Sequence, residues 1–280
     1  MRSGPIIRME DVWFKYDFDW ILKGISLEIY QRELIGIVGP TGSGKTTLVK
    51  HFNGLLKPTR GRVLVNGYDT TKYPVSFISK FVGYVCQNPS HQIFAPTVYD
   101  EIAFGPNNFG MENVDEIVKK TADTFGLTEK LNASPFSLSM GEKELVCIAS
   151  ILSFDPKVII LDEPTIGQDF ESYLRLIGLL KKLREIRKTI VLISHNIDMI
   201  AECSDRIIAL LNGQKIFDGS SKRFFSDQKL LEKLKLPTPS SFKLKSIPQF
   251  KETLLDSNNC LLYTSPSPRD LSTSRMPSSA

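Results

Sequence analysis

Short apolar runs alternate along the chain with longer segments whose apolar residues recur at helical spacing. The runs at 34–38, 158–161 and 189–193 are continuously apolar and predict buried strands, and 82–85 predicts another short strand. The helical pattern predicts helices at 47–56, 97–104, 113–125, 172–187 and 197–203, and a further helix that runs through Leu145 and Leu152 to a stop at Asp155-Pro156. Strands that alternate with helices indicate an α/β fold with a parallel sheet, whose strand carboxyl ends lie along one edge.

Other segments alternate apolar and polar residues at every second position, as half-buried strands do. Residues 6–16 predict an edge strand and 25–29 a second strand by this alternation, and 62–67 reads as a further strand followed by a turn. Residues 206–210 and 215–217 predict a closing hairpin around Asn212-Gly213.

Composition narrows the class of protein. The chain of 280 residues is long enough for a full core, and no run of 18 apolar residues could span a membrane. The first residues lack an apolar signal segment, and the four cysteines have no CxxC spacing, so we expect free thiols and no cysteine metal site. A net charge of +4 is too small for this length to indicate an acidic partner.

A glycine-rich segment follows the strand predicted at 34–38 and leads into a helix. Strand, glycine-rich loop and helix in this order predict a phosphate-binding loop, in which backbone N–H groups and the helix N-terminus face phosphate oxygens. Lys45 is expected to reach the β- and γ-phosphates, and Thr46 to give its hydroxyl to Mg²⁺. The nucleotide-binding residues predicted here are Gly39, Pro40, Thr41, Gly42, Ser43, Gly44, Lys45, Thr46 and Thr47.

Polar side chains follow three of the predicted strands. Asp162 ends the strand at 158–161 and is a candidate second anchor for Mg²⁺, and the adjacent Glu163 is a candidate general base. Both could instead cap the next helix, for which Pro164 would be a suitable first residue. Gln87 could reach Mg²⁺ or water through its amide, and His195 could donate a hydrogen bond to a γ-phosphate.

Tyr16 lies 29 positions before Lys45. It could stack on a nucleotide base, because every base offers a π face. It could equally be an ordinary aromatic residue of the first strand.

The ordered set of motifs resembles an ABC-type ATPase from residue 6 to about residue 220. The Walker A motif matches 39–46, the Q-loop matches Gln87, the signature matches 138–142, the Walker B motif matches 158–163 and the H-loop matches His195. The resemblance implies a P-loop NTPase of α/β class with an ABC-type ATP-binding core, an antiparallel β subdomain and an inserted α-helical subdomain. It further implies catalytic roles for Glu163, His195, Lys45 and Gln87, ATP as substrate with Mg²⁺ held by Thr46, Gln87 and Asp162, and Tyr16 as the aromatic that stacks on adenine.

The signature residues imply a dimer. In the family, two nucleotides are sandwiched between head-to-tail protomers, so Ser139 and Gly141 would contact the γ-phosphate bound by the opposite protomer, and Asp169 would be the D-loop carboxylate at the seam. The segment here is Leu138, Ser139, Met140, Gly141 and Glu142. Met140 stands where the family has a glycine, and Leu145 stands where it usually has an arginine. We therefore expect an asymmetric pair with a paralogous ATPase rather than a symmetric pair of this chain.

Residues 85–98 and 100–106 resemble the ATPase subunits of energy-coupling factor transporters and of the related cobalt and nickel importers. This resemblance implies a peripheral protein at the cytoplasmic face of the cell membrane that powers uptake of a vitamin or a transition metal ion. Its partners would be a second ABC ATPase subunit, a transmembrane coupling protein and a membrane substrate-binding subunit. The groove near the Q-loop would receive helices of the coupling protein, and no nucleic acid is expected to bind.

Two other functions use the same phosphate loop. A soluble ABC ATPase acting on DNA or ribosomes would carry a long coiled coil between Walker A and the signature, or two ATPase domains; here 47–137 is short and one ATPase domain is present. A small-molecule kinase would leave the signature and His195 unexplained. Both observations favour transport.

The sequence divides into an ABC ATP-binding domain at 1–236, with the helical subdomain at about 88–153, and a C-terminal part. Residues 237–259 predict a truncated appendage that is either a small docking element or a loose tail. Residues 260–280 resemble a translated sequencing-library adapter and are expected to be disordered, which would place the natural C-terminus beyond about residue 259.

Overall fold

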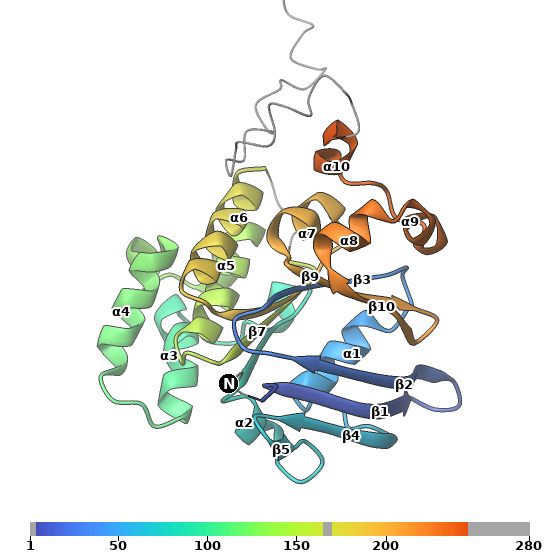
Figure 1. Cartoon of the computed structure of the whole chain (residues 1–280). Coiled ribbons are helices and arrows are strands. Elements are labelled where there is room, and N and C mark those ends of the chain that lie inside the picture. The colour runs from blue at the N-terminus through green and yellow to red at the C-terminus, as the bar shows by residue number, and fades with distance from the viewer. Residues whose placement is uncertain (1–3, 165–169, 246–280) are drawn as a thin grey trace, which may run out of the picture.

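The computed structural model describes residues 4–164 and 170–245, and within them two sheets are flanked by helices (Figure 1). The larger sheet has the strand order β10-β9-β3-β8-β7-β6, and all its neighbouring pairs are parallel except β9 with β10. Its strands are β3 (Leu34–Val38), β6 (Val82–Val85), β7 (Val158–Asp162), β8 (Thr189–Ile193), β9 (Arg206–Leu211) and β10 (Gln214–Ser220). The predicted α/β fold with a parallel central sheet is confirmed.

The smaller sheet is antiparallel, with the order β2-β1-β4-β5. Its strands are β1 (Ile7–Lys15), β2 (Trp20–Ile29), β4 (Arg60–Val65) and β5 (Tyr68–Asp69). The prediction of an edge strand at 6–16 is wrong, because β1 pairs with β2 on one side and with β4 on the other. Its alternating pattern reflects one face packed on the core and one face open to solvent, which any strand of such a sheet shows.

Helices cover both faces of the central sheet and form a separate group beside its β6 edge (Figure 1). Their bounds are Lys45–Phe52 (α1), Val75–Ile78 (α2), Val98–Asn108 (α3), Val114–Phe125 (α4), Met140–Leu152 (α5), Phe170–Glu185 (α6), Ile197–Cys203 (α7), Ser221–Ser226 (α8), Gln228–Leu234 (α9) and Ser240–Lys245 (α10). α3 continues beyond the predicted end at 104 and includes Pro106. None of the helices in the described segments combines the length and the apolar character that crossing a bilayer requires.

Alternate side chains of the central strands enter two different cores. Ile35 and Ile37 of β3 pack with α1 and the antiparallel sheet, whereas Leu34 and Val38 pack on the opposite face with α6, α7 and α8. A third core lies between α3, α4 and α5 and gives the helical subdomain its own packing. The central sheet is thus buried on both faces, as its continuously apolar strands predicted.

The described part of the C-terminal appendage is docked. The backbone N–H of Ser240 donates to Oδ1 of Asp198 on α7 at 2.6 Å, and the Phe242 ring lies 5.5 Å from that of Phe225. Ser240 and Phe242 therefore pack on the rest of the chain, and the domain boundary at residue 236 and the role of 237–259 stay predictions. The segment resembling an adapter, 260–280, lies outside the described residues, so the expectations about it stay predictions.

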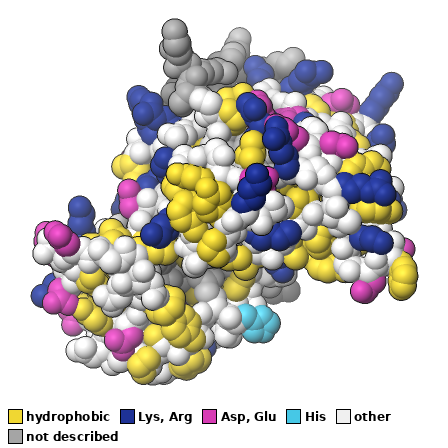
Figure 2. All heavy atoms as spheres, turned by 90° about the horizontal axis from the view of Figure 1, so that it is seen from below, with side chains coloured by type: hydrophobic (Ala, Val, Ile, Leu, Met, Phe, Trp, Pro, Cys, Tyr) yellow, Lys and Arg dark blue, Asp and Glu magenta, His cyan; other side chains and the backbone are white. Residues whose placement is uncertain are grey.

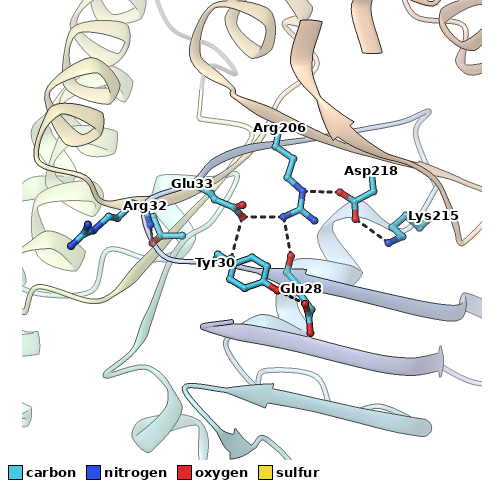
Figure 3. Close-up of polar contacts among 8 residues, drawn as sticks. Glu28, Tyr30, Arg32, Glu33, Arg206, Lys215 and Asp218 are labelled. Carbon is cyan, nitrogen blue, oxygen red and sulfur yellow. Dashed lines mark hydrogen bonds and ion pairs between the residues drawn. The ribbon is translucent and has the colours of Figure 1, made fainter. Parts of the chain in front are cut away.

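A network of charged groups joins the two sheets (Figure 3). Arg206 on β9 donates from Nε to Oδ1 of Asp218 at 2.7 Å, and from Nη1 to the carbonyl of Glu28 and to Oε2 of Glu33, both at 3.0 Å. Lys215 donates to the other oxygen of Asp218 at 3.0 Å. Burial alone would raise the pKa of Asp218, but the hydrogen bonds from Arg206 and Lys215 outweigh it and hold this pKa below its usual range.

We expect Arg206→Gln to lower the free energy of unfolding by about 2–3 kcal/mol, because it leaves half-buried carboxylates without their donor. Urea denaturation followed by circular dichroism measures the change. Arg184→Gln is the matched control, since Arg184 pairs with Asp205 where both side chains are about half exposed, and it should cost less than about 1 kcal/mol. Equal effects of the two substitutions would contradict a structural role for the Arg206 network.

Candidate functional site

The predicted phosphate loop lies between β3 and α1, at the carboxyl edge of the central sheet (Figure 1). Gly39, Gly42 and Gly44 have φ angles of 150°, 78° and 99°, which favour glycine over residues with a side chain. A Cβ atom on Gly39 would stand 2.2 Å from the carbonyl oxygen of Leu210 on β9. The loop therefore runs against the neighbouring strand with no room for a side chain at its first residue.

Lys45 closes this loop from inside. Its Nζ donates to the carbonyl of Gly39 at 2.8 Å and to that of Pro40 at 3.1 Å, and the residue is buried. Burial lowers the pKa of Lys45, while the nearby carboxylates of Glu163 and Asp162 act in the opposite direction. The ammonium group thus lies in the concave side of the loop, where it can meet phosphate oxygens. Thr41 and Gly42 are exposed at the loop tip, and Ser43 and Thr47 are buried at its base.

Asp162 ends β7 and is almost completely buried. Its Oδ1 accepts a hydrogen bond from Oγ1 of Thr46 at 3.3 Å, and its Oδ2 accepts one from the hydroxyl of Tyr84 at 2.8 Å. Burial raises the pKa of Asp162, and the two hydroxyl donors act against this rise. The structure therefore brings the two predicted Mg²⁺ ligands Thr46 and Asp162 together, although they are 116 positions apart in the chain.

These groups fit a magnesium ion. A hydroxyl and a carboxylate are the hard oxygen ligands that Mg²⁺ prefers, and Mg²⁺ commonly takes one or two protein ligands and completes its shell with phosphate and water. Gln87, the third predicted ligand, is exposed just beyond the end of β6, the strand next to β7. Its assignment to the metal stays a prediction.

Glu163 points away from Asp162 because the backbone turns sharply between them. Its φ angle is +55°, a left-handed conformation uncommon for a residue with a side chain, and its N–H donates to the carbonyl of Ile193 at 2.9 Å. Oε2 of Glu163 accepts a hydrogen bond from the backbone N–H of His195 at 2.8 Å, and Oε1 lies 3.3 Å from Nε2 of the same residue. Burial raises the pKa of Glu163, with the His195 backbone hydrogen bond lowering it in part.

The ends of β7 and β8 thus hold a buried carboxylate beside a more exposed imidazole. The imidazole of His195 is 56% exposed, so it can contact both Glu163 and a group outside the protein. A carboxylate of raised pKa is suited to accept a proton from water.

Tyr16 follows β1 directly and is 59% exposed. Its ring lies edge-to-face on Phe14 at 4.9 Å, and Phe14 lies edge-to-face on His51 of α1 at 4.8 Å. This row of rings ties Tyr16 to the helix that begins at the phosphate loop. An exposed, anchored ring is suited to stack on a base, and that role stays a prediction.

The signature residues lie in the helical subdomain at the start of α5. Ser139 is the N-cap: its Oγ accepts from the N–H of Glu142, and the Glu142 carboxylate accepts from the N–H of Ser139 in return, which completes a capping box. Lys130 also donates to Glu142 and, with Ser139, lowers the pKa of Glu142 to about 2. Leu138 packs against the core of the subdomain, Gly141 is buried and Met140 is exposed at the first position of the helix.

Leu145 is half-buried one helical turn further along α5, beside Glu144. Glu144 is buried, which raises its pKa to about 8. Asp169, the predicted D-loop carboxylate, lies outside the described residues and stays a prediction.

Tyr84 is a residue of this site that the sequence analysis did not single out. The feature that could have identified Tyr84 is its position, three residues before Gln87 on a strand that pairs in parallel with β7. Side chains two positions apart on a strand share a face, so a tyrosine here can reach the end of the neighbouring strand.

A groove of about 870 Å³ runs along the free edge of β6, between α2, α3 and α5. Its wall includes Cys86 and Tyr84 of the β6 segment, and its rim includes Phe94 and Phe104, whose rings pack edge-to-face at 4.6 Å and are each about half exposed. Figure 2 shows the molecule from below Figure 1, with hydrophobic side chains exposed in several clusters, one of them on the lobe at the lower left, the side on which α3 and α4 lie. We call the groove between α2, α3 and α5 at the free edge of β6 the β6 groove.

Comparisons with known proteins agree with this geometry. The ABC transporter family profile matches residues 22–166. A putative ABC transporter ATP-binding protein of Caldanaerobacter subterraneus subsp. tengcongensis is 44% identical over 86% of this chain, which spans 43% of that protein's length. The energy-coupling factor transporter ATP-binding protein EcfA of Methanocaldococcus jannaschii is 38% identical over 89% of this chain and 91% of its own length. The solved structure of cbiO1 from Clostridium perfringens, part of the ABC transporter complex cbiONQ, covers 88% of this chain and all of its own with a TM-score of 0.73 and 30% identity.

We expect Gly39→Ala to damage the loop. The added methyl group would stand 2.2 Å from the Leu210 carbonyl, and relieving such a contact costs about 1–3 kcal/mol. The temperature of thermal unfolding and the affinity for a fluorescent ATP analogue should both fall. Gly178→Ala is the control, because nothing lies within 4 Å of a Cβ at that position on α6. If Gly39→Ala binds nucleotide as well as Gly178→Ala does, the close approach is not needed.

Proposed function

This chain belongs to the ABC transporter ATP-binding family, and from that premise we propose that it is the ATPase subunit of a membrane importer of the energy-coupling factor type. Members of the family bind ATP and hydrolyse it to power transport. The observation that carries the hydrolytic assignment is the contact between Glu163 and the backbone N–H of His195, which fixes a buried carboxylate beside the phosphate loop. The likeness to an energy-coupling factor ATPase over 89% of the chain supports the type of transporter.

The proposed binding of ATP uses residues from the first 47 positions of the chain. The N–H groups of the loop from Gly39 to Thr46 surround the phosphates, and Nζ of Lys45 exchanges its two carbonyl partners for the β- and γ-phosphate oxygens. The exposed face of Tyr16 stacks on the adenine.

Hydrolysis then needs a base and a stabilised phosphoryl group. Mg²⁺, held by Thr46 and Asp162, would neutralise charge on the β- and γ-phosphates. Glu163 accepts the proton of the attacking water through its carboxylate, and its raised pKa makes it a better base than an exposed glutamate. His195 holds Glu163 through its backbone N–H and directs its imidazole to the γ-phosphate. Gln87 is assigned to the shell of the metal or the water.

The proposed catalytic unit is a head-to-tail dimer. Ser139 and Gly141 contact the γ-phosphate bound by the opposite protomer, where they add hydrogen-bond donors to the transferring group. Met140 places an exposed side chain beside this contact. We therefore propose that the partner ATPase is a paralogue whose own site this signature completes poorly, while the site on this chain receives the partner's signature.

Glu163→Gln should lower ATP hydrolysis at least about 100-fold, in the range expected for loss of a general base, while ATP binding is retained. Phosphate release measures the first quantity and a fluorescent ATP analogue the second. Glu116→Gln on the exposed face of α4 is the control and should hydrolyse normally. A Glu163→Gln enzyme that still hydrolyses ATP at the normal rate would remove Glu163 from the mechanism.

The same variant tests the pairing. Light scattering of Glu163→Gln in Mg·ATP should show a monomer that binds ATP, because a symmetric pair would need two Met140 signatures. Met140→Gly added to Glu163→Gln should then permit an ATP-dependent dimer. A dimer of Glu163→Gln without the second substitution would contradict the asymmetric pair.

The proposed membrane partner is a transmembrane coupling protein, with a separate membrane subunit that selects a vitamin or a transition metal ion. The β6 groove supports this docking, since apolar rings on its rim and a concave wall suit a short helix. The protein would then lie at the cytoplasmic face of the cell membrane.

Phe104→Asp should abolish co-purification of this chain with its transmembrane partner from solubilised membranes, because it places a charge on the apolar rim of the groove. Ile186→Asp is the control, since Ile186 is an exposed apolar residue beyond the end of α6. Both variants should unfold at the same temperature as the parent protein. If the partner co-purifies with both variants, or with neither, docking at the β6 groove is contradicted.

A further inference from the structure

Tyr84 stands where the β6 groove meets the magnesium ligands. β6 is the outermost strand of the central sheet on this side, and Tyr84 is paired in register with Ile160 of β7. Asp162 lies two residues beyond Ile160, so it shares a face of the sheet with Tyr84. The tyrosine hydroxyl consequently reaches the Asp162 carboxylate and donates a 2.8 Å hydrogen bond to Oδ2.

This bond holds one of the two oxygens of a carboxylate that has little contact with water. Asp162 is 1% exposed, and its other oxygen accepts from Thr46 at 3.3 Å. The two hydroxyl donors come from different elements, Thr46 from α1 and Tyr84 from β6, and each holds one oxygen of the carboxylate. The hydroxyl of Tyr84 stays protonated at physiological pH, because burial and the Asp162 charge raise its pKa.

The same residue belongs to the wall of the β6 groove. It lines that groove together with Cys86, Lys80 of the segment after α2, and Phe104 of α3. A helix seated in the groove would therefore lie against a side chain whose far end holds Asp162. One residue spans the distance from the docking surface to the metal ligand.

We propose that Tyr84 is a positioning residue: it orients the Asp162 carboxylate for Mg²⁺ and makes that orientation depend on the occupant of the β6 groove. Partners of metal ligands commonly set the affinity of a site, and their loss typically costs 10–100-fold in metal affinity or activity. The first half of the proposal concerns this chain alone. The second half rests on the proposed docking of a transmembrane subunit.

The first half is tested with Tyr84→Phe, which removes one oxygen atom and keeps the ring. The Mg²⁺ concentration for half-maximal binding, followed through a fluorescent ATP analogue on the full chain, should rise about 10-fold or more. Affinity for the analogue in EDTA should not change, since the phosphate loop and Tyr16 are intact. That measurement also shows that the variant is folded.

Tyr99→Phe is the matched control. Tyr99 also donates its hydroxyl to an aspartate, Asp115, but in the helical subdomain on an exposed surface. It should leave the Mg²⁺ midpoint unchanged. A Tyr84→Phe protein with the same Mg²⁺ midpoint as Tyr99→Phe would overturn the positioning role.

The second half is tested in the complex with the transmembrane partner. Docking should shift the Mg²⁺ midpoint of the parent protein, and Tyr84→Phe should reduce or abolish that shift while the partner still co-purifies. A shift of the same size in both proteins would overturn the link through Tyr84. If the partner does not bind the parent protein, the proposed docking fails instead, and the result of the first measurement stands.

Discussion

The site depends on burying two adjacent carboxylates at the end of β7. A carboxylate taken out of water is costly unless donors replace the water, and both pKa values are raised by burial. Asp162 receives the hydroxyls of Thr46 and Tyr84, and Glu163 receives the backbone N–H of His195. The charge of Lys45 acts against this rise at both carboxylates without cancelling it. Phosphate loop, β6, β7 and β8 must therefore be in place together before either carboxylate is satisfied.

The left-handed residue at Glu163 separates the two roles. In a regular strand the next side chain would simply point to the other face of the sheet, into the core beneath α6. The φ angle of +55° turns the chain out of the strand, and the N–H of Glu163 is used by the carbonyl of Ile193 on β8. Such a backbone conformation typically costs about 1–3 kcal/mol. Here it lets the carboxylate of Asp162 face Thr46 while that of Glu163 faces His195.

Local sequence patterns predicted most helices and strands, but they did not predict the contacts between elements that are distant in the sequence. The glycines of 39–46 and the apolar runs at 158–161 and 189–193 carry their structure in neighbouring residues, and the fold they predict is confirmed. The central position of β1 in its sheet could not be predicted from residues 6–16. Alternation of apolar and polar residues indicates that one face of a strand is buried, but it does not indicate whether one or two strands pair with it. The hydrogen bond of Tyr84 to Asp162 joins residues 78 positions apart, and that of Arg206 to the carbonyl of Glu28 joins residues 178 positions apart, so neither contact can be predicted from neighbouring residues.

In the proposed head-to-tail pair, one side chain of the signature would make the two ATPase sites unequal. At the start of α5, Ser139 and Glu142 satisfy each other, so the capped helix end is already formed in the single chain. A γ-phosphate from an opposite protomer would approach that end near Met140, whose side chain is exposed there, and a glycine would leave the backbone open to the phosphate. The phosphate loop, Asp162, Glu163 and His195 of this chain are unaffected by Met140, because they lie on the central sheet and not on α5. In the proposed head-to-tail pair, Met140 would thus weaken the partner's site and leave this chain's own site intact. The ATP bound by this chain would then account for most of the hydrolysis.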